Sequence, residues 1–156
     1  MPRLYTCSFK NVTIAAAQDL ISVLGVTNRV IRIQRMWLAM NDTTLQTAQG
    51  LRLNLKRGTA TVTTGSGGAA VTPTPLDSGD VAATFTSRRN DTTPATTSGA
   101  FTDLFPCGGH NYGGLNVNFG NNGPLCIEGQ TIIFELLSTV SGTCNFSGGM
   151  ICEELG

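Results

Sequence analysis

The amino-acid sequence predicts an all-β protein, folded as one antiparallel β-sandwich of the jelly-roll kind over residues 1–156. Apolar and polar residues alternate with a period of two in several segments, which is typical of strands with one buried face. Clusters of Gly, Asn, Ser, Thr and Pro separate these segments, and no regular alternation of helices with strands is present. A closely related β-barrel remains as the alternative. The length fits a single domain.

The first segment that needs interpretation covers residues 12–24. Val12 and Ile14 alternate with polar neighbours, as in a strand. The apolar residues that follow are spaced by three and four, as on one face of a helix. These residues are Ala17, Leu20, Ile21 and Leu24. We favour strand, bend and strand over this segment, with a helix as the alternative.

A long strand, expected to be central, covers residues 29–40, where β-branched and aromatic side chains are frequent. Alternation along the strand divides its side chains between two faces. The apolar face is expected to contain Ile31, Ile33 and Trp37, and the polar face Arg32 and Gln34.

The clearest alternation in the chain lies between residues 51 and 56. The apolar positions are Leu51, Leu53 and Leu55, and the polar positions are Arg52, Asn54 and Lys56. This pattern predicts a strand with a leucine face in the core and a polar face in water. A charge introduced at Leu53 should therefore prevent folding, whereas one introduced at Lys56 should be tolerated.

Three further strands are expected at residues 115–119, 131–137 and 149–155. The first repeats the period-two alternation between two glycine-rich turns. The other two are separated by a turn-rich stretch at Ser141, Gly142 and Thr143, and we interpret them as two antiparallel strands that close the domain.

Gly, Thr, Ser and Pro dominate residues 65–75 and 88–99, which predicts two long surface loops. Binding residues in proteins are frequently placed on loops that a rigid scaffold supports. The loops near Arg88 and Tyr112 are accordingly candidates for contact with a sugar or a receptor.

The charge of the chain argues against two classes of partner. The formal net charge is zero and 13% of the residues are charged, so the sequence has no basic field of the kind that binds DNA or RNA. No run of about 18 apolar residues could cross a membrane, and residues 1–7 lack the apolar core of a signal peptide. We therefore expect no nucleic-acid or membrane partner and a soluble protein made in a cytosol.

The balance of apolar and charged residues also suggests self-association. Apolar residues make up 40% of the chain, and little net charge opposes contact between copies. The sequence therefore predicts that part of the surface is covered by another subunit, in a homo-oligomer.

The five cysteines do not form a recognisable metal or redox motif. Cys7, Cys107, Cys126, Cys144 and Cys152 are odd in number and include no C-x-x-C pair, so we expect mostly reduced, buried thiols. The single histidine, His110, lies three residues after Cys107 across two glycines. A metal corner or a Cys-His nucleophilic pair is less favoured there than the tip of a loop.

Two short motifs resemble sites that the surrounding sequence does not support. Asp77, Ser78 and Gly79 match the triplet of aspartic proteases, but that chemistry needs two such aspartates, and the nearby prolines favour a turn. Residues 65–68, Gly-Ser-Gly-Gly, lack the lysine and helix of a phosphate loop and are interpreted as a flexible turn. No catalytic, cofactor-binding or metal-binding residue is assigned, and no cofactor is expected.

Several segments together are similar to a family of small proteins encoded among the structural genes of tailed phages and prophages. The amino-proximal match is Ala16-Ala17-Gln18-Asp19-Leu20, and residues 51–58 resemble the family strand that ends in Arg-Gly. The most specific matches follow in order at residues 63–68, 72–76, 82–86 and 90–93. Residues 147–155 resemble the closing strand with its acidic pair, whereas residues 105–126 depart from the pattern.

The resemblance implies a virion-associated β-sandwich without catalytic residues. Among virion roles, we expect capsid decoration, with the assembled lattice of the phage major capsid protein as partner and the host bacterial cytoplasm as the place of synthesis. A tail or fibre component is the first alternative. A carbohydrate- or receptor-binding module is the second.

Overall fold

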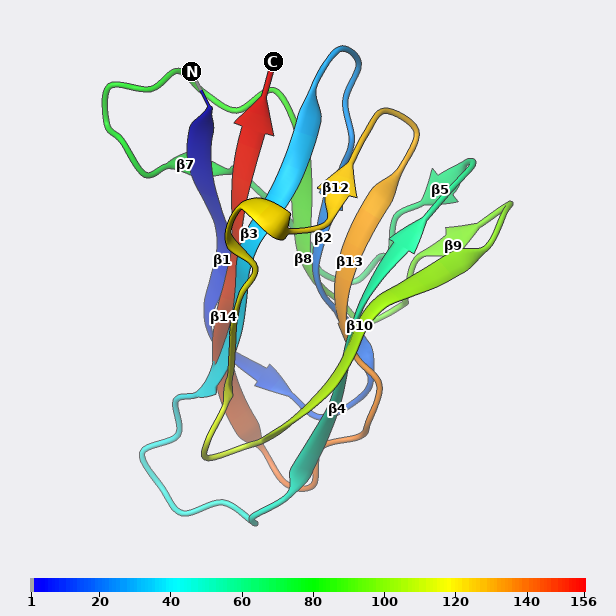
Figure 1. Ribbon diagram of the computed structural model, residues 1–156. Helices are drawn as coiled ribbons and strands as arrows, with labels where there is room; N and C mark the ends of the chain where they lie inside the picture. The colour runs from blue at the N-terminus through cyan, green and yellow to red at the C-terminus, as the bar shows by residue number, and fades with distance from the viewer. Residues whose placement is uncertain (1) are drawn as a thin grey trace.

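The computed structural model describes residues 2–156 and consists of two large antiparallel sheets packed face to face (Figure 1). This arrangement confirms the predicted all-β sandwich. Within these residues the only helical element is a single 3-10 turn at Gly120–Asn122. The described part of the chain contains no helix with the length and apolar character needed to cross a membrane.

The first sheet, sheet A, has the strand order β11-β3-β14-β1-β7, and β12 also pairs with β3. Its long members span most of the molecule, and both chain ends lie at the same end of the sandwich (Figure 1). The strands are β1 (Arg3–Ile14), β3 (Val30–Met40), β7 (Thr74–Pro75), β11 (Leu115–Asn118), β12 (Leu125–Cys126) and β14 (Cys144–Leu155).

The second sheet, sheet B, has the strand order β10-β4-β13-β2-β8-β6. Its strands are β2 (Gln18–Leu24), β4 (Gly50–Gly58), β6 (Ala69–Val71), β8 (Thr86–Asp91), β10 (Phe101–His110) and β13 (Thr131–Leu136). A third, two-stranded sheet pairs β5 (Val62–Thr63) with β9 (Thr96–Thr97).

The pairing of the main strands identifies the sandwich as a jelly roll. The chain has eight main strands when β11 and β12 are counted as one: β1, β2, β3, β4, β10, β11/β12, β13 and β14. The first of these pairs with the eighth, the second with the seventh, the third with the sixth and the fourth with the fifth. A two-stranded ribbon that is rolled up produces this order, which distributes the strands over two sheets.

The structure settles two of the strand predictions. Residues 12–24 form the end of β1, a bend and β2, so the interpretation as strand, bend and strand is confirmed. The two closing strands also form, but they are not partners. β13 pairs with β2 and β4 in sheet B, whereas β14 pairs with β1 and β3 in sheet A, because the chain crosses between the sheets at residues 137–143.

The predicted facing of Trp37 is wrong. Ile31 and Ile33 are buried as expected, but the pairing of β3 with β14 shifts at Gln34, which is an extra residue opposite the partner strand. Such a bulge reverses the alternation beyond it. Met36 is therefore in the core, and Trp37 lies half-buried on the outer face of sheet A.

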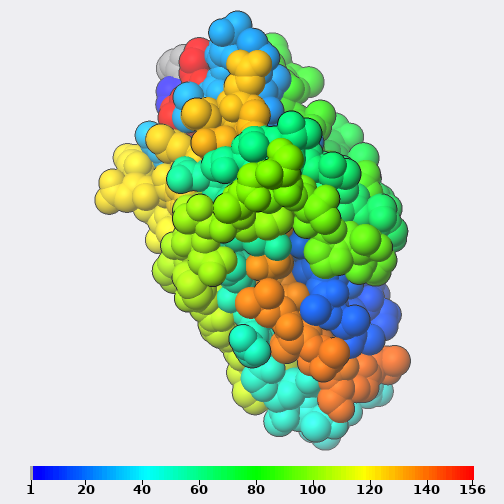
Figure 2. Space-filling model, turned by 90° about the vertical axis from the view of Figure 1, so that its right-hand side faces the viewer, coloured from blue at the N-terminus to red at the C-terminus, as the bar shows by residue number. Residues whose placement is uncertain are grey.

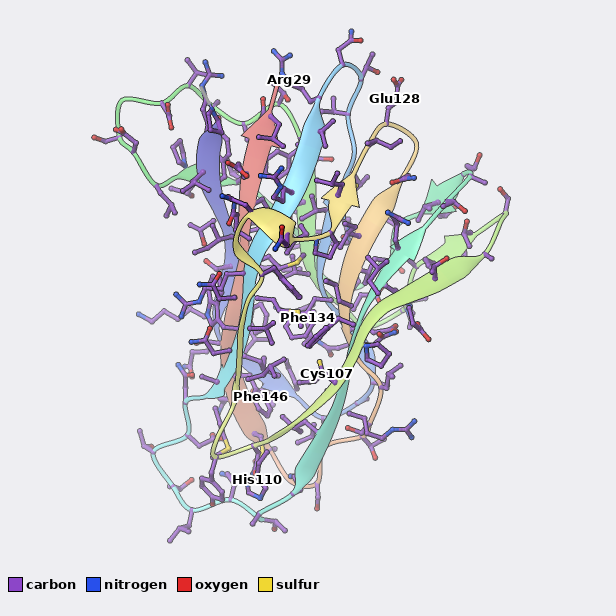
Figure 3. All side chains as sticks on the ribbon, in the orientation of Figure 1. Arg29, Cys107, His110, Glu128, Phe134 and Phe146 are labelled. Carbon is purple, nitrogen blue, oxygen red and sulfur yellow. The ribbon has the colours of Figure 1, made fainter. Side chains whose placement is uncertain are left out.

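The core fills the space between the two sheets, and Figure 3 shows Phe134 of β13 and Phe146 of β14 within it. The leucine face predicted for β4 is buried as expected. Leu51, Leu53 and Leu55 are each at most 2% exposed.

Residues 59–100 connect β4 to β10 in a long excursion that begins and ends over the outer face of sheet B and passes along the edge of sheet A at β7 (Figure 1). Figure 2 shows this excursion in green across that face. It contains β5 to β9, of which β6 and β8 extend sheet B and β7 extends sheet A. The two long surface loops predicted at residues 65–75 and 88–99 are therefore in part strands, because their short polar segments pair with the edges of the sandwich.

Candidate functional site

The protease-like triplet is a turn on the surface, as the sequence analysis favoured. The Oδ1 atom of Asp77 accepts a hydrogen bond from the backbone N–H of Gly79 at 2.9 Å. The backbone N–H of Asp80 donates to the carbonyl of Asp77 at 3.1 Å. Both bonds are local, and the carboxylate closes its own turn.

Cys107 and His110 do not form a site, and they do not lie at a loop tip. Both belong to β10, where side chains at odd and even positions point to opposite faces. Cys107 lies toward the core, whereas His110 is exposed at the far end of the strand (Figure 3). The glycines between them are accommodated because β10 is an edge strand. Within residues 2–156 there is no cluster of three His, Cys, Asp or Glu side chains that could hold a metal ion.

The five cysteines are unpaired, and four of them are buried. Burial raises the pKa of Cys126 to about 11. Cys7 and Cys152 contact one another, and the hydrogen bond between the thiols lowers the pKa of Cys7 and raises that of Cys152. Their strands pair Tyr5 with Cys152, so the two cysteines are diagonal neighbours, with Cα atoms roughly 7–8 Å apart, too far for a disulfide.

The two residues proposed for receptor contact are engaged within the protein. Arg88 lies on β8, and its guanidinium binds both carboxylate oxygens of Asp91 at 2.9 and 2.7 Å. Tyr112 lies in the turn after β10, where its hydroxyl accepts the backbone N–H of Gln46 and donates to the carbonyl of the same residue. Its ring stacks on His110. The structure does not bring Arg88 and Tyr112 together.

The sequence reasoning missed a buried polar layer between sheet B and the excursion. Neighbouring strands bring its members to one face, because Glu135 of β13 lies opposite both Asn54 of β4 and Asp19 of β2. Asp19 in turn lies opposite Asp91 of β8. The polar layer comprises Asp19, Asn54, Lys56, Arg88, Asp91 and Glu135, all of them buried except the half-buried Arg88.

Lys56 is therefore not in water, contrary to the prediction from the alternation in β4. The side chain is 8% exposed. Its ammonium group pairs with Glu135 and lies 4.4 Å from the centre of the Phe101 ring. The alternation identified the correct face of the strand, but the excursion covers that face. Asn54 joins the same network by donating to Glu135 at 3.0 Å.

Asp19 is the carboxyl in the polar layer that lacks a cation of its own. Lys56 pairs with Glu135 and Arg88 pairs with Asp91, whereas Asp19 Oδ2 accepts only the backbone N–H of Ala95, at 2.7 Å. Its Oδ1 atom is buried without a partner. Burial raises the pKa of Asp19 to about 6, and the Ala95 N–H and Lys56 oppose the rise.

A carboxyl with a raised pKa is a common mark of a catalytic acid, but this one has no access to substrate. Asp19 is 2% exposed and does not line the cavities described below. Its contact with Ala95 attaches the excursion to β2. Gln18 does the same by donating to Asn90. Within the excursion, Gly68 donates its N–H to Asp91 and so binds the glycine turn to β8. The arrangement holds the fold together, and it presents no reactive atoms to a ligand.

The turn at residues 65–68 is also held in place, by another part of the excursion. Ser66 and Thr93 exchange two backbone hydrogen bonds, both 3.0 Å long. A Cβ atom added to Gly68 would lie 2.0 Å from the carbonyl oxygen of Arg89. The turn was expected to be flexible, but it packs directly on β8, and glycine is needed there for close approach.

Open cavities lie at the ends and along one side of the sandwich. A cleft of about 590 Å³ lies between residues 59–62 and the turn at 128–131. A cavity of about 320 Å³ lies beside Leu4 and Leu76. Two smaller cavities, of about 240 and 270 Å³, both have Arg89 in their lining.

Fold and site together define a jelly-roll protein with a buried polar layer beneath the excursion. Comparisons of the chain with protein families, with curated proteins and with solved structures gave no match.

Proposed function

We propose that this protein is a non-enzymatic structural component of a tailed-phage virion, and specifically a decoration subunit that binds the assembled lattice of the coat protein. The observation that carries the proposal is a group of exposed apolar side chains at the end of the sandwich that holds both chain termini. Decoration requires a binding surface and no chemistry, and this surface is of that kind.

This group, which we call the terminal-end surface, is contributed by three parts of the chain. Its members are Leu4 of β1, Leu76 and Val81 of the excursion, and Leu125 and Ile127 on the other side of sheet A beyond β3. They are between 38% and 57% exposed. The excursion is held against β1 here, because the Leu76 N–H donates to the Leu4 carbonyl at 2.9 Å and the Tyr5 hydroxyl donates to the Val81 carbonyl at 3.1 Å. Apolar side chains on a firmly held framework suit docking to another protein.

The segments that resemble phage structural proteins support a scaffold role. Gln18 and Asp19 of β2 bind Asn90 and Ala95 of the excursion, and residues 63–68 bind residues 91 and 93 within it. The pattern shared with that family therefore concerns the way the sandwich holds its longest connection. A scaffold of this kind fits a virion protein that must stay folded while it binds.

Weak charge fits the same role. The chain has no net charge, so long-range attraction contributes little to its association, and apolar contacts would dominate. A homo-oligomer that touches several coat subunits at once gains affinity from the sum of modest contacts. Binding should therefore depend on the completed lattice.

Co-sedimentation tests this proposal. The protein is mixed with assembled capsids of its own phage, with unassembled coat subunits, or with neither, at two salt concentrations. We expect the protein to pellet with capsids at both salt concentrations and to bind the free subunits poorly. Retention in the supernatant with capsids, together with capture on a host-cell surface, would contradict capsid decoration.

Two variants locate the contact. Leu76→Asp and Val81→Asp each place a charge on the terminal-end surface and should weaken capsid binding at least tenfold. Leu45→Asp is the matched control, because Leu45 is 95% exposed in the loop between β3 and β4, at the opposite end of the sandwich. Equal loss of binding in all three variants would contradict the assigned surface.

A further inference from the structure

The two cavities that share Arg89 form a groove along the side of the sandwich where β1 of sheet A approaches β8 of sheet B. One cavity, of about 240 Å³, is lined by residues of β1 and of the β6–β7 segment. The other, of about 270 Å³, is lined by the far end of β1, the start of β2 and the glycine turn. Each alone is slightly smaller than a typical small-ligand site, roughly 300 to 1,000 Å³, and together they fall within that range. We call them the β1–β8 groove.

Arg89 is electrostatically exceptional. Each of the other partly buried lysines and arginines among residues 2–156 makes a side-chain hydrogen bond or an ion pair, whereas Arg89 makes neither. The carboxylate nearest along the chain, Asp91, is already bound by Arg88 through both oxygens. The positive charge of Arg89 is therefore not offset by a neighbour, and a guanidinium in that state favours an anion that accepts two parallel hydrogen bonds.

The rest of the lining is polar and carries no negative charge. None of the described residues that line either cavity is Asp or Glu. Hydroxyl groups are frequent along the groove, and amides occur at one end. The hydroxyl residues are Thr6, Ser8, Thr13, Thr72, Thr74 and Thr92, of which Thr13 already donates to Asn145 and Thr74 to the Thr72 carbonyl. The amides of Gln18 and Asn90 bind one another. Within residues 2–156, the hydroxyls of the groove without such a bond are therefore those of Thr6, Ser8, Thr72 and Thr92. Such groups donate to and accept from the hydroxyls of a ligand.

We propose that the β1–β8 groove binds an acidic saccharide, with the carboxylate of a uronate-type sugar on Arg89 and the sugar hydroxyls on the threonine and serine side chains. One cation without a partner, in a lining without carboxylates, selects a single negative charge. The many hydroxyls select a polyhydroxylated ligand over a bare anion. No aromatic ring lines the groove, so a single site binds weakly, and display in an oligomer raises the total affinity.

This site is separate from the surface proposed for capsid binding. Arg89 lies on β8, on the long side of the sandwich, whereas the terminal-end surface lies at one end. A decoration subunit could therefore remain on the capsid while the groove contacts a polysaccharide. Neither proposal depends on the other.

Nuclear magnetic resonance titration of the full chain tests the proposal with three probes: a galacturonate tetrasaccharide, a neutral galactose tetrasaccharide and inorganic phosphate. We expect amide shifts at the groove with the acidic tetrasaccharide and at least tenfold weaker binding of the neutral one. Equal affinity for the two saccharides would overturn the role of Arg89. Phosphate binding without saccharide binding would overturn the ligand class.

Variants make the test specific. Arg89→Gln should lower the affinity for the acidic tetrasaccharide at least tenfold, because a charge-assisted bidentate contact is lost. Arg89→Lys keeps the charge and should lose several-fold, since only the fork geometry is removed. Arg52→Gln is the matched control, with the same change of charge at an exposed arginine outside the groove. Wild-type affinity in both Arg89 variants would refute the proposed site.

Discussion

Asp19 is the residue whose replacement tests the polar layer most sharply. Burial raises its pKa from the ordinary 3.8 to about 6, so the folded protein holds this proton more tightly than the unfolded chain does. The resulting stabilisation is fully present below the unfolded pKa and is lost as the pH rises through the folded pKa. Because one pKa unit corresponds to about 1.4 kcal/mol, the ionised carboxylate lowers the free energy of unfolding by about 3 kcal/mol at pH 7.

Asp19→Asn removes the charge and keeps an oxygen that can accept the N–H of Ala95. The amide nitrogen replaces an oxygen that has no partner, and any penalty for this, about 1–3 kcal/mol, is the same at every pH. Only the ionisation changes with pH. Relative to the variant, the wild-type protein should therefore gain about 2 kcal/mol of unfolding free energy between pH 7.5 and pH 4.5.

Urea unfolding at the two pH values, followed by the fluorescence of the single tryptophan, measures this change. Contributions from groups that do not interact with Asp19 cancel in the difference between wild type and variant. Asp77→Asn is the control, because Asp77 is exposed in its turn, and the corresponding difference should stay within about 0.5 kcal/mol. A pH-independent difference for Asp19→Asn would refute the account of the polar layer.

Three other predictions follow from the same structure. Lys56→Asp should lower the free energy of unfolding by about 3–5 kcal/mol in urea, because it leaves Glu135 unpaired. Arg52→Asp on the same strand should change it by about 0.5 kcal/mol or less, and equal effects of the two variants would mean that Lys56 is solvated. Gly68→Ala should lower the melting temperature more than Gly129→Ala. The Cβ added at Gly68 meets the Arg89 carbonyl, whereas the Cβ added at Gly129, where φ is 76°, meets nothing within 4 Å. The reverse order of melting temperatures would contradict the packing of the glycine turn. Dithiothreitol should leave the melting temperature unchanged, because all five cysteines are unpaired, and a large fall would reveal a disulfide.

Local patterns predicted the strands well and their surroundings poorly. The alternation of residues 51–56 placed β4 correctly and identified its buried leucines. It could not show that the opposite face is covered, because the cover comes from residues 59–100, which are held by contacts with β2 such as that between Ala95 and Asp19. The polar face of β4 therefore has the composition of a surface and the burial of a core.

Two further errors have equally specific causes. The bulge at Gln34 reverses the facing of Trp37, and a one-residue shift of this kind leaves no mark in the composition of a strand. Gly108 and Gly109 suggested a loop, but they lie in β10, which is an edge strand of sheet B. The pairing of the first strand with the last, which defines the jelly roll, joins β1 to β14 across nearly the whole chain. Alternation within a segment carries no information about such a partner.

The excursion links the polar layer to both proposed binding surfaces. It supplies Leu76 and Val81 to the terminal-end surface and Arg89 to the β1–β8 groove. A connection of this length, rich in Gly, Thr and Ser, buries few apolar side chains of its own, so its position must be fixed by polar contacts. Asp19 accepts the Ala95 N–H. An apolar residue at position 19 would leave this buried N–H without a partner, at a cost of about 1–3 kcal/mol. The carboxylate is therefore unfavourable as a charge and useful as an acceptor, since it holds in place the segment on which binding would depend.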